Sequence, residues 1–478
     1  MRRGGPALDW ETKPLPFKLY PDLEPLRLPT GLPAPALETF AAIRGGPIAR
    51  PAPLGIERLA AALFFSAGVM RVKTYPGGGQ IHFRAAPSTG ALYQTEVYVV
   101  AGAVEGLDAG VYHFGPGDFS LRRLRAGDWR GALARAAADE VIATQPAALV
   151  LSAIYWRNTW KYEARGYRHL FWDSGSMLSQ LLAVARALDL PARLVTGFVD
   201  AEVGALLGLD GSKEGALVIA PLGAPGAPAP PPAALTPLAL ATVPLSPREV
   251  DYPLLREAYQ ESSLAAAPEV TAWRPGRGHV LRSDISPVHP PTSRSIGETI
   301  ARRGSTREFS GEAIGREALL AALDHAAGPI PMDVPDGSVE PHVNVHAVDG
   351  IEPGAYAYDR DRRALTLLRA GDVRRASAFL CLEQALGGTS SATVFFLSDL
   401  ERVLAAWGNR GYRLANLEAG LRGGRLYLAA YGQGFGATGL TFYDRAVTEF
   451  FRDSSSPRAA GLDAIFVTAL GRSRPRSP

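Results

Sequence analysis

The stretch Val104–Arg130, VEGLDAGVYHFGPGDFSLRRLRAGDWR, has a second copy in the same chain at Val348–Arg374, VDGIEPGAYAYDRDRRALTLLRAGDVR. The offset of 244 residues holds without a gap through the whole segment. In each copy, alternating apolar residues flank a glycine-containing turn, which is typical of a strand, a turn and a second strand. This repeat predicts that the chain contains two copies of one domain.

Further pairs of segments occur in the same order. A helix-like segment ending at Gly68, IERLAAALFFSAG, matches REALLAALDHAAG, which ends at Gly328, at an offset of 260. The remaining pairs are RGYR at 165–168 and 410–413, which opens a long helix-like segment, and a closing strand, LVIAPLG at 217–223 and IFVTALG at 465–471. Because the offset falls from 260 to 244 between the first helix and the strand pair, the second copy is 16 residues shorter there.

The pairs also predict the domain boundaries. We expect an N-terminal extension at 1–40, a first domain at 41–225 and a second domain at 291–478. Between the domains lies a Pro-rich linker, 226–290, which we expect to be extended apart from one helix from about Ser246 to Ser262.

The composition is that of a soluble globular protein with more than one domain. The chain has 478 residues, 47% of them hydrophobic and 20% charged. A net charge of +3 gives no electrostatic basis for binding nucleic acid. No secretory signal and no apolar stretch of about 18 residues occur, so we expect no membrane span and a cytoplasmic location. The single cysteine, Cys381, excludes disulfides within the chain and is expected to be a buried apolar residue.

Three motifs resemble the nitroreductase superfamily, and within it the SagB/thiazoline-oxidase-type dehydrogenases. They are Arg303-x-Ser305-x-Arg307, the segment PSTGALY at 87–93, and WKYEARGYR at 160–168 together with LLGLD at 206–210. The resemblance omits only the N-terminal extension and the linker. It implies an α+β fold class: two tandem nitroreductase-like, FMN-dependent α/β sandwich domains with mainly antiparallel sheets, which form an intramolecular pseudo-dimer.

The resemblance also implies how the cofactor, FMN, is held between two subunits. One subunit supplies a phosphate clamp, a glycine turn and basic residues near the C-terminus, which are here Arg303, Ser305, Arg307, Thr438, Gly439, Arg472 and Arg474. The other supplies a Pro-Ser loop, which is here Pro87, Ser88, Thr89, Gly90 and Leu92. Paired arginines around a hydroxyl suit a phosphate dianion, and a Ser-Gly loop allows backbone N–H groups to approach the flavin edge.

The two copies divide these motifs between them. At the offset of 260, the clamp positions of the first copy are Ile43, Gly45 and Pro47, with only Arg44 nearby. The second copy has only PMDVPDGSVEP, residues 331–341, where the first has its Pro-Ser loop. We therefore expect one complete FMN site per chain, made by the clamp of copy two and the loop of copy one.

Two residues are candidates for proton transfer. Lys161 and Tyr167 lie in a polar, aromatic cluster, and the resemblance implies a Lys and a Tyr with this role in the neighbourhood. A desolvated Lys can act as a base near neutral pH. The alternative is a solvated helix face, and the recurrence of RGYR in both copies favours a structural role for those four residues. The eight histidines have no metal-ligand spacing, so we expect no metal site.

These observations predict an FMN-dependent oxidoreductase that transfers hydride through flavin N5, with NAD(P)H as a candidate transient electron donor. One alternative is a SagB-like azoline dehydrogenase in peptide or natural-product maturation. A second alternative is a non-catalytic flavin-binding protein. The substrate would be a small molecule or peptide-derived, no nucleic acid or membrane partner is expected, and further homodimerisation is left open.

Overall fold

The computed structural model describes residues 8–76, 79–231, 234–274, 292–452 and 461–474. The elements up to the end of the first domain are η1 Trp10–Thr12, β1 Pro25–Arg27, α1 Thr39–Arg44, α2 Ile56–Ala67, β2 Val69–Thr74, β3 Gln80–Arg84, η2 Thr89–Ala91, β4 Thr95–Ala101, β5 Gly110–Gly115, β6 Ser120–Ala126, α3 Arg130–Ala136, α4 Val141–Thr144, β7 Ala147–Ile154, α5 Tyr155–Tyr162, η3 Glu163–Arg165, α6 Gly166–Ala187, α7 Asp200–Leu207 and β8 Glu214–Leu222.

The linker and the second domain contribute the remaining elements. They are α8 Pro253–Glu261, α9 Ala267–Trp273, α10 Ile296–Arg302, α11 Arg316–Ala327, β9 Glu340–Val345, β10 Gly354–Asp359, β11 Ala364–Ala370, α12 Arg374–Leu380, α13 Ala385–Thr389, β12 Ala392–Ser398, α14 Leu400–Trp407, α15 Arg410–Gln433, β13 Gly436–Gly439, α16 Asp444–Arg452 and β14 Asp463–Gly471.

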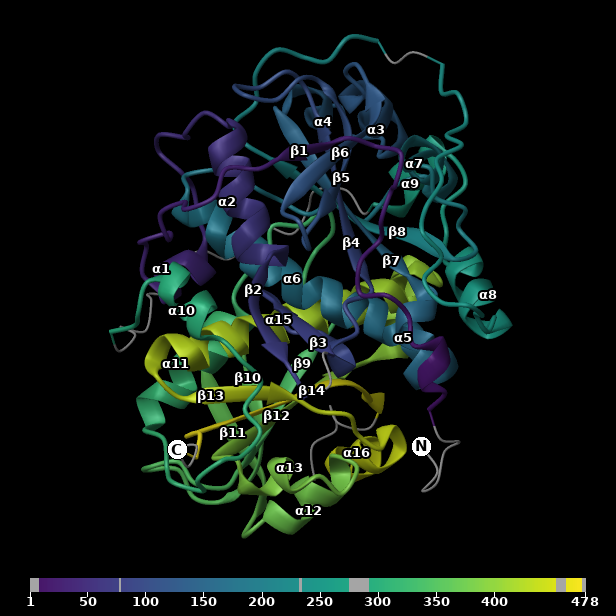
Figure 1. The fold of residues 1–478 in the computed structure, drawn as a ribbon. Helices are drawn as coiled ribbons and strands as arrows, with labels where there is room; N and C mark the ends of the chain where they lie inside the picture. The colour runs from purple at the N-terminus through teal and green to yellow at the C-terminus, as the bar shows by residue number, and fades with distance from the viewer. Residues whose placement is uncertain (1–7, 77–78, 232–233, 275–291, 453–460, 475–478) are drawn as a thin grey trace.

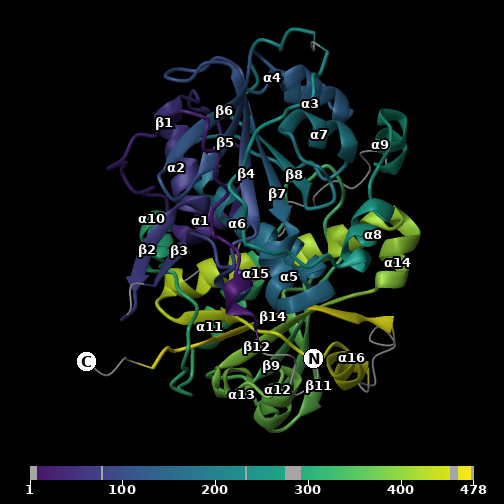
Figure 2. The ribbon, with the colours of Figure 1, turned by 45° about the vertical axis from the view of Figure 1, so that its right-hand side comes forward.

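Each domain is built around a six-stranded sheet. The strand orders are β1-β6-β5-β4-β7-β8 and β11-β10-β9-β12-β14-β13, and neighbouring strands in both sheets are antiparallel. The segments that opened the repeat form the hairpins β5–β6 and β10–β11. Figures 1 and 2 show α6 and α15 running between the two sheets. The predicted fold class, two tandem α+β domains with antiparallel sheets joined as a pseudo-dimer, is confirmed.

The long helices α6 and α15 approach closely because glycines face each other where they meet. A Cβ on Gly175 would lie 2.4 Å from the Leu417 carbonyl oxygen, and one on Gly420 would lie 2.4 Å from the Trp172 carbonyl oxygen. Glycine inside a helix costs about 1 kcal/mol relative to alanine. Here that cost is offset by backbone-to-backbone packing that a side chain would prevent. Gly175 and Gly420 are separated by the repeat offset of 245, so equivalent residues meet at the pseudo-twofold axis.

Matched ion pairs fasten the domains on either side of this axis. Asp200, the first residue of α7, accepts from Arg410 at 2.6 Å and from Arg413 at 2.7 Å. Asp444, the first residue of α16, accepts from the equivalent arginines of the other RGYR motif, those at 165 and 168. Each RGYR motif thus holds an aspartate of the opposite domain, which gives the recurring arginines a structural role.

Three additions distinguish the first half of the chain. The antiparallel hairpin β2–β3 occupies 69–84, where the second copy is shorter. β1 from the N-terminal extension pairs with β6 and supplies an edge strand. The linker crosses the first domain, as the Val243 N–H to Leu19 carbonyl bond (3.0 Å) illustrates.

The helix expected in the linker from about Ser246 to Ser262 is shorter than predicted. It begins only at Pro253, which lies at the N-terminus of α8, where a proline needs no hydrogen-bond partner for its nitrogen. A second short helix, α9, follows it. Residues 275–290 of the predicted linker lie outside the described residues. In the part of the chain that the structure covers, no helix is long and apolar enough to cross a membrane.

Candidate functional site

The clamp motif follows directly after α10 in the second domain. Arg303 donates from Nε to the Ala85 carbonyl at 2.7 Å and from Nη2 to the Arg84 carbonyl at 2.8 Å. Burial lowers the pKa of this guanidinium. Ser305 lies 3.3 Å from the Tyr427 hydroxyl. Both carbonyls that Arg303 binds belong to the first domain, just before the Pro-Ser loop, so the clamp is bonded to the segment that leads into the loop.

Arg307 is the clamp residue that remains available to a ligand. Its side chain is exposed, and it has no hydrogen-bond or ion-pair partner among the described residues. It lies close enough to Lys161 and Tyr162 of the first domain to contribute to the lowered pKa of Lys161 and to oppose the raised pKa of Tyr162. A free guanidinium beside a hydroxyl, at a junction of two domains, is a donor set that suits a phosphate group.

The Pro-Ser loop is held in place by Asp173 of α6. This buried carboxylate accepts from the Ser88 hydroxyl at 2.6 Å, from the Thr89 N–H at 2.8 Å and from the Thr89 hydroxyl at 2.7 Å. Burial raises the pKa of Asp173 above its ordinary value, although these donors oppose the shift. The loop also has positive φ at three residues: Gly90 (66°), Ala91 (54°) and Tyr93 (50°). Such strained conformations persist only where surrounding bonds enforce them, and they cluster at functional sites.

The glycine turn lies beside the clamp as β13. A Cβ on Gly436 would lie 2.1 Å from Thr306 Oγ1 and 2.5 Å from Ser473 Oγ, so only glycine fits there. The Gly439 N–H donates to the Tyr427 hydroxyl at 2.5 Å, and Thr438 is buried. The turn, the clamp and a tyrosine of α15 therefore meet at one place.

The two predicted C-terminal arginines differ in position. Arg472 donates from Nε to the Ala313 carbonyl at 3.0 Å, away from the clamp. The Arg474 N–H bonds to the carbonyl of Glu308, next to the clamp, and its exposed guanidinium lies 3.7 Å from the Glu308 carboxylate. Ser473 between them reaches 3.3 Å from Thr306 Oγ1. The sequence analysis did not select Ser473, although its place in the RSR run after the closing strand was a signal.

Lys161 and Tyr167 do not share one site. Lys161 lies in the last turn of α5 near Arg307, and burial together with this arginine lowers its pKa. Tyr167 lies 2.9 Å from the Ser262 hydroxyl, and its ring stacks on Tyr412 with centroids 6.2 Å apart. Tyr412 is its repeat equivalent, so Tyr167 is a packing residue at the pseudo-twofold axis.

Tyr162, next to Lys161, is the tyrosine that lies at the Pro-Ser loop. A Cβ on Gly90 would lie 3.0 Å from the Tyr162 hydroxyl. Burial and the Asp173 carboxylate raise the pKa of Tyr162 to about 12, although Arg307 opposes the shift. Tyr162 belongs to the WKYEARGYR motif at 160–168, but the sequence alone does not show which tyrosine of the motif faces the loop, and Tyr167 was chosen instead.

The equivalent position in the first domain is closed. Ala192 bridges to Leu222 as Ala437 pairs with Leu470, so the repeat offset makes Leu194 the counterpart of Gly439. The Leu194 N–H donates to the Pro331 carbonyl at 2.7 Å, and its carbonyl accepts from the Asp333 N–H at 3.0 Å. Segment 331–333 of the second domain therefore pairs with both backbone groups of Leu194, whereas in the intact half the Gly439 N–H is bound by the side chain of Tyr427.

Comparison with known proteins identifies the family. The model of the Nitroreductase family matches residues 56–224 and 300–455, which together make up more than half of the chain. The chain belongs to the nitroreductase family. The two matched segments correspond to the two copies of the repeat, so this nitroreductase-family chain is a tandem duplication.

Two solved or curated relatives define how far the similarity extends. The crystal structure of a putative nitroreductase from Anabaena variabilis ATCC 29413 resembles the whole chain, with a TM-score of 0.77, 28% identity, and coverage of 98% of this chain and 96% of that one. Putative nitroreductase MJ1384 from Methanocaldococcus jannaschii is 31% identical over 172 residues, or 36% of this chain and 81% of that protein.

A third relative is the Microcin B17-processing protein McbC from Escherichia coli. It is 29% identical over 160 residues, or 30% of this chain and 55% of that protein, so the match spans about half of the relative. Together with the family match, these similarities support an oxidoreductase of the nitroreductase superfamily.

Proposed function

We propose that this nitroreductase-family protein is an FMN-dependent oxidoreductase with one FMN per chain, bound between the two domains. The observation that carries the proposal is the contact of Arg303 with the carbonyls of residues 84 and 85, because it joins the clamp of one domain to the Pro-Ser loop of the other. Arg307 and Ser305 would hold the phosphate, and Thr438 and Gly439 would lie under the flavin ring. FMN, when bound, supplies hydride transfer at its N5 atom.

The chain's own contribution to the chemistry is to position groups and to move a proton. Asp173 fixes the backbone of the Pro-Ser loop, so that Ser88, Thr89 and Gly90 present a preorganised edge. Lys161, whose pKa is lowered by burial and by Arg307, is the group that can accept a proton nearer neutral pH. Tyr162 lies beside it and can orient or share that proton.

One site per chain follows from the closed counterpart. The bonds of Leu194 to residues 331 and 333 occupy the backbone groups that correspond to the glycine turn. The first copy also has no clamp arginines at 43, 45 and 47. FMN content therefore tests the whole arrangement.

The first test is the flavin content of the purified, full-length protein after reconstitution with FMN. We expect one FMN per chain from the absorbance at flavin wavelengths. Loss of the Arg307-to-phosphate bond costs about 1.5–3 kcal/mol, and loss of Arg303 removes the bonds that hold the clamp against residues 84 and 85. The double variant Arg303→Ala/Arg307→Ala should therefore bind FMN at least 100-fold more weakly, whereas Arg44→Ala, the matched control in the first copy, should bind like the parent. No FMN binding by the parent protein would refute the proposal, and two FMN would refute the one-site arrangement.

The second test concerns the proton-transfer pair. Lys161→Met and Tyr162→Phe should each lower turnover about 100-fold or more while leaving the FMN content at one per chain, because positioned acid–base groups contribute roughly 10²–10⁴-fold. Turnover would be followed with NAD(P)H as donor and a nitroaromatic or quinone acceptor. Unchanged turnover in both variants would remove the proposed role.

The similarity to the microcin-processing protein favours a second candidate function, dehydrogenation of an azoline ring in a peptide or natural product. The adjacent Lys161 and Tyr162 at the loop suit removal of a ring proton. Incubating the FMN-loaded protein with a thiazoline-containing peptide under oxygen would lower the peptide mass by two hydrogens. Conversion of the azoline without NAD(P)H oxidation favours this candidate, and the reverse favours the reductase. FMN binding without either activity would leave a non-catalytic flavoprotein.

A further inference from the structure

A cavity of about 650 Å³ lies in the first domain, away from the candidate flavin site. Its walls come from the N-terminal extension, α5, the loop after α7 and the linker strap, residues 238–256, that crosses them. None of the clamp, Pro-Ser loop or glycine-turn residues lines it. The volume is in the range of about 300–1,000 Å³ that small-molecule sites occupy.

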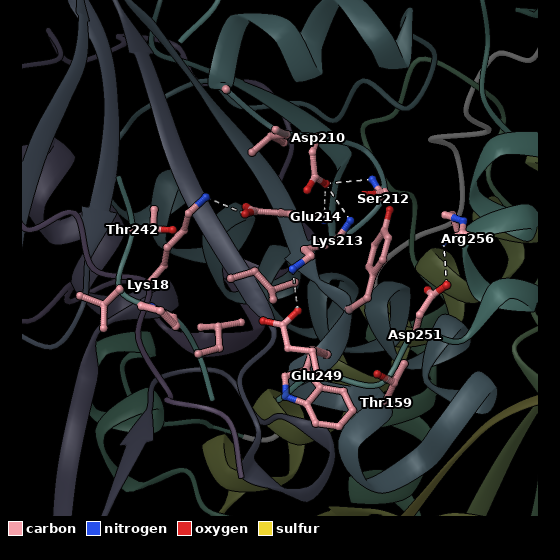
Figure 3. Close-up of a pocket in the computed structure, with 18 of the residues that line it drawn as sticks. Lys18, Thr159, Asp210, Ser212, Lys213, Glu214, Thr242, Glu249, Asp251 and Arg256 are labelled. Atoms are coloured by element: carbon pink, nitrogen blue, oxygen red, sulfur yellow. Dashed lines mark hydrogen bonds and ion pairs between the residues drawn. The ribbon is translucent and has the colours of Figure 1, made fainter. Parts of the chain in front are cut away.

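The charged groups around this cavity are already neutralised by one another. Figure 3 shows the ion pairs Lys18–Glu214 at 2.7 Å, Lys213–Glu249 at 3.2 Å and Arg256–Asp251 at 2.7 Å. The remaining charged lining residue, Asp210, accepts from the backbone N–H groups of residues 212–214. The Lys18–Glu214 pair is the buried one of the three, so a charged ligand that reaches it would have to break it or enter without a partner, which costs free energy in a partly enclosed site.

Apolar and aromatic residues make up most of the rest of the lining, which also includes a buried hydroxyl without a hydrogen-bond partner. The rings of Tyr20, Tyr155, Trp156 and Tyr252 contribute to it, together with aliphatic side chains of the linker strap. Thr159 lines the same space and is only 2% exposed, yet its hydroxyl has no hydrogen-bond partner among the described residues. A buried hydroxyl that faces a cavity can donate to a carbonyl or ether oxygen of a ligand.

We propose that this cavity is a binding site for an uncharged ligand with an aromatic or branched aliphatic body and a hydrogen-bond acceptor for Thr159. The proposal is independent of the flavin. Bound there, the ligand would contact Trp156, which belongs to an apolar cluster with Leu92 of the Pro-Ser loop and Tyr162. A ligand in the cavity would therefore contact residues that pack against the candidate active site.

A set of closely related phenylalanine derivatives that differ in charge, compared at pH 6 so that the amine is protonated, tests the proposal. N-acetyl-phenylalaninamide is neutral, N-acetyl-phenylalanine is anionic and phenylalaninamide is cationic, and each would be titrated into the full-length protein by calorimetry. We expect the neutral probe to bind with a Kd of about 1 mM or below, in line with ligands of this size. The two charged probes should bind at least tenfold more weakly.

Two variants locate the binding to the cavity. Thr242→Trp fills the space from an exposed strap position that lines the cavity, and it should weaken the neutral probe at least tenfold. Its neighbour Ala241→Trp is equally exposed but lies outside the lining, so it should bind like the parent. Thr159→Val keeps the shape but removes the hydroxyl, and should weaken binding several-fold.

The proposal is overturned if the neutral probe binds with a Kd above about 10 mM, which corresponds to a binding free energy weaker than about −3 kcal/mol. It is also overturned if the charged probes bind as well as the neutral one, or if Thr242→Trp and Ala241→Trp bind alike. Thermal unfolding of each variant establishes that the chain is folded before titration, and Thr159→Val provides the measurement if the tryptophan variant does not fold.

Discussion

The glycine turn at Gly439 and its counterpart at Leu194 have the same place in the two halves but different surroundings. At Gly439 the backbone N–H meets the Tyr427 hydroxyl beside the clamp. At Leu194 both backbone groups are paired with the segment 331–333. The strand register is the same in the two halves, so the difference arises from what lies opposite the turn. Duplication therefore preserved the scaffold, while the short connecting segments decide which of the two places can accept a ligand.

The largest expected difference between the two halves is in the free energy of unfolding that the ion pairs of Asp200 and of Asp444 contribute. Asp200 and its two arginines are nearly fully buried, whereas the Asp444 side chain is 41% exposed. Asp200→Asn should lower the free energy of unfolding by about 3–5 kcal/mol, because it leaves two guanidiniums buried without a carboxylate. Asp444→Asn should cost about 1 kcal/mol or less. Denaturant unfolding measures both, and equal losses would contradict the difference in burial.

The same aspartate predicts a pH dependence. Burial alone would raise the pKa of Asp200, but Arg410 and Arg413 outweigh it, so the pKa lies below its ordinary value. A lowered carboxylate pKa contributes stability above the unfolded-state value of about 3.9, and this stability is lost as the pH falls below it. The gap in unfolding free energy between the parent and Asp200→Asn should therefore be full at pH 7 and shrink below about pH 4. A constant gap from pH 7 to pH 3 would contradict the assignment.

The crossing of the two long helices should be sensitive to a single methyl group. Gly420→Ala places its Cβ 2.4 Å from a backbone oxygen of α6, so the helices must separate, and we expect a loss of about 1–3 kcal/mol. Gly175→Ala should have a similar effect from the other helix. The control is Gly204→Ala in α7, where the new Cβ meets nothing within 3.5 Å and should be neutral or stabilising by up to about 1 kcal/mol. Melting temperatures compare the three variants, and a neutral Gly420→Ala would show that the helices have room to move.

The segment that covers the counterpart position in the first domain can be loosened without changing the intact site. Asp333 accepts from the Thr196 N–H at 2.8 Å, from the Gly197 N–H at 3.0 Å and from Arg274 at 2.9 Å. Asp333→Asn should cost about 1–3 kcal/mol of stability through these bonds. The FMN content should remain one per chain, since the first copy has no clamp to bind a second phosphate. A rise towards two would mean that the segment alone keeps FMN out.

The smallest expected effect separates the two candidate tyrosines. Tyr167→Phe removes the bond to the Ser262 hydroxyl and should cost about 1 kcal/mol of stability with unchanged turnover. Tyr162→Phe should instead lower turnover and leave the free energy of unfolding nearly unchanged. Measuring stability and turnover for both variants decides between them, and a loss of turnover in Tyr167→Phe would return the catalytic role to that residue.

Much of the architecture could be predicted because its strands and helices produce periodic patterns of apolar residues in the sequence. The strand pairs and long helices recur at nearly constant offsets, and the offset of 245 makes Gly175 equivalent to Gly420 and Tyr167 equivalent to Tyr412. The division of clamp and loop between the copies predicted a site shared by the two domains, and Arg303 bonds to the carbonyls of residues 84 and 85, just before the loop.

Contacts made by irregular segments could not be predicted in this way. Helix α6 is apolar nearly all round, so its pattern could not show that Tyr167 faces Tyr412 rather than Lys161. The pairing of Leu194 with residues 331–333 uses backbone groups, which carry no sequence signal. The cavity under the linker strap depends on how an extended, Pro-rich segment lies on the first domain, which periodicity does not describe.

The linker that crosses the first domain also changes the thermodynamics of assembly. A dimer of separate subunits loses its shared sites on dilution, because association depends on protein concentration. In this chain the two halves are covalently joined, so docking of clamp to loop is a unimolecular event with a fixed effective concentration. The stability of the assembly and the integrity of the shared site should then be independent of how dilute the protein is. A substitution in one half also occurs only once in the pseudo-dimer, whereas in a homodimer it would occur in both subunits. The two halves can therefore diverge independently.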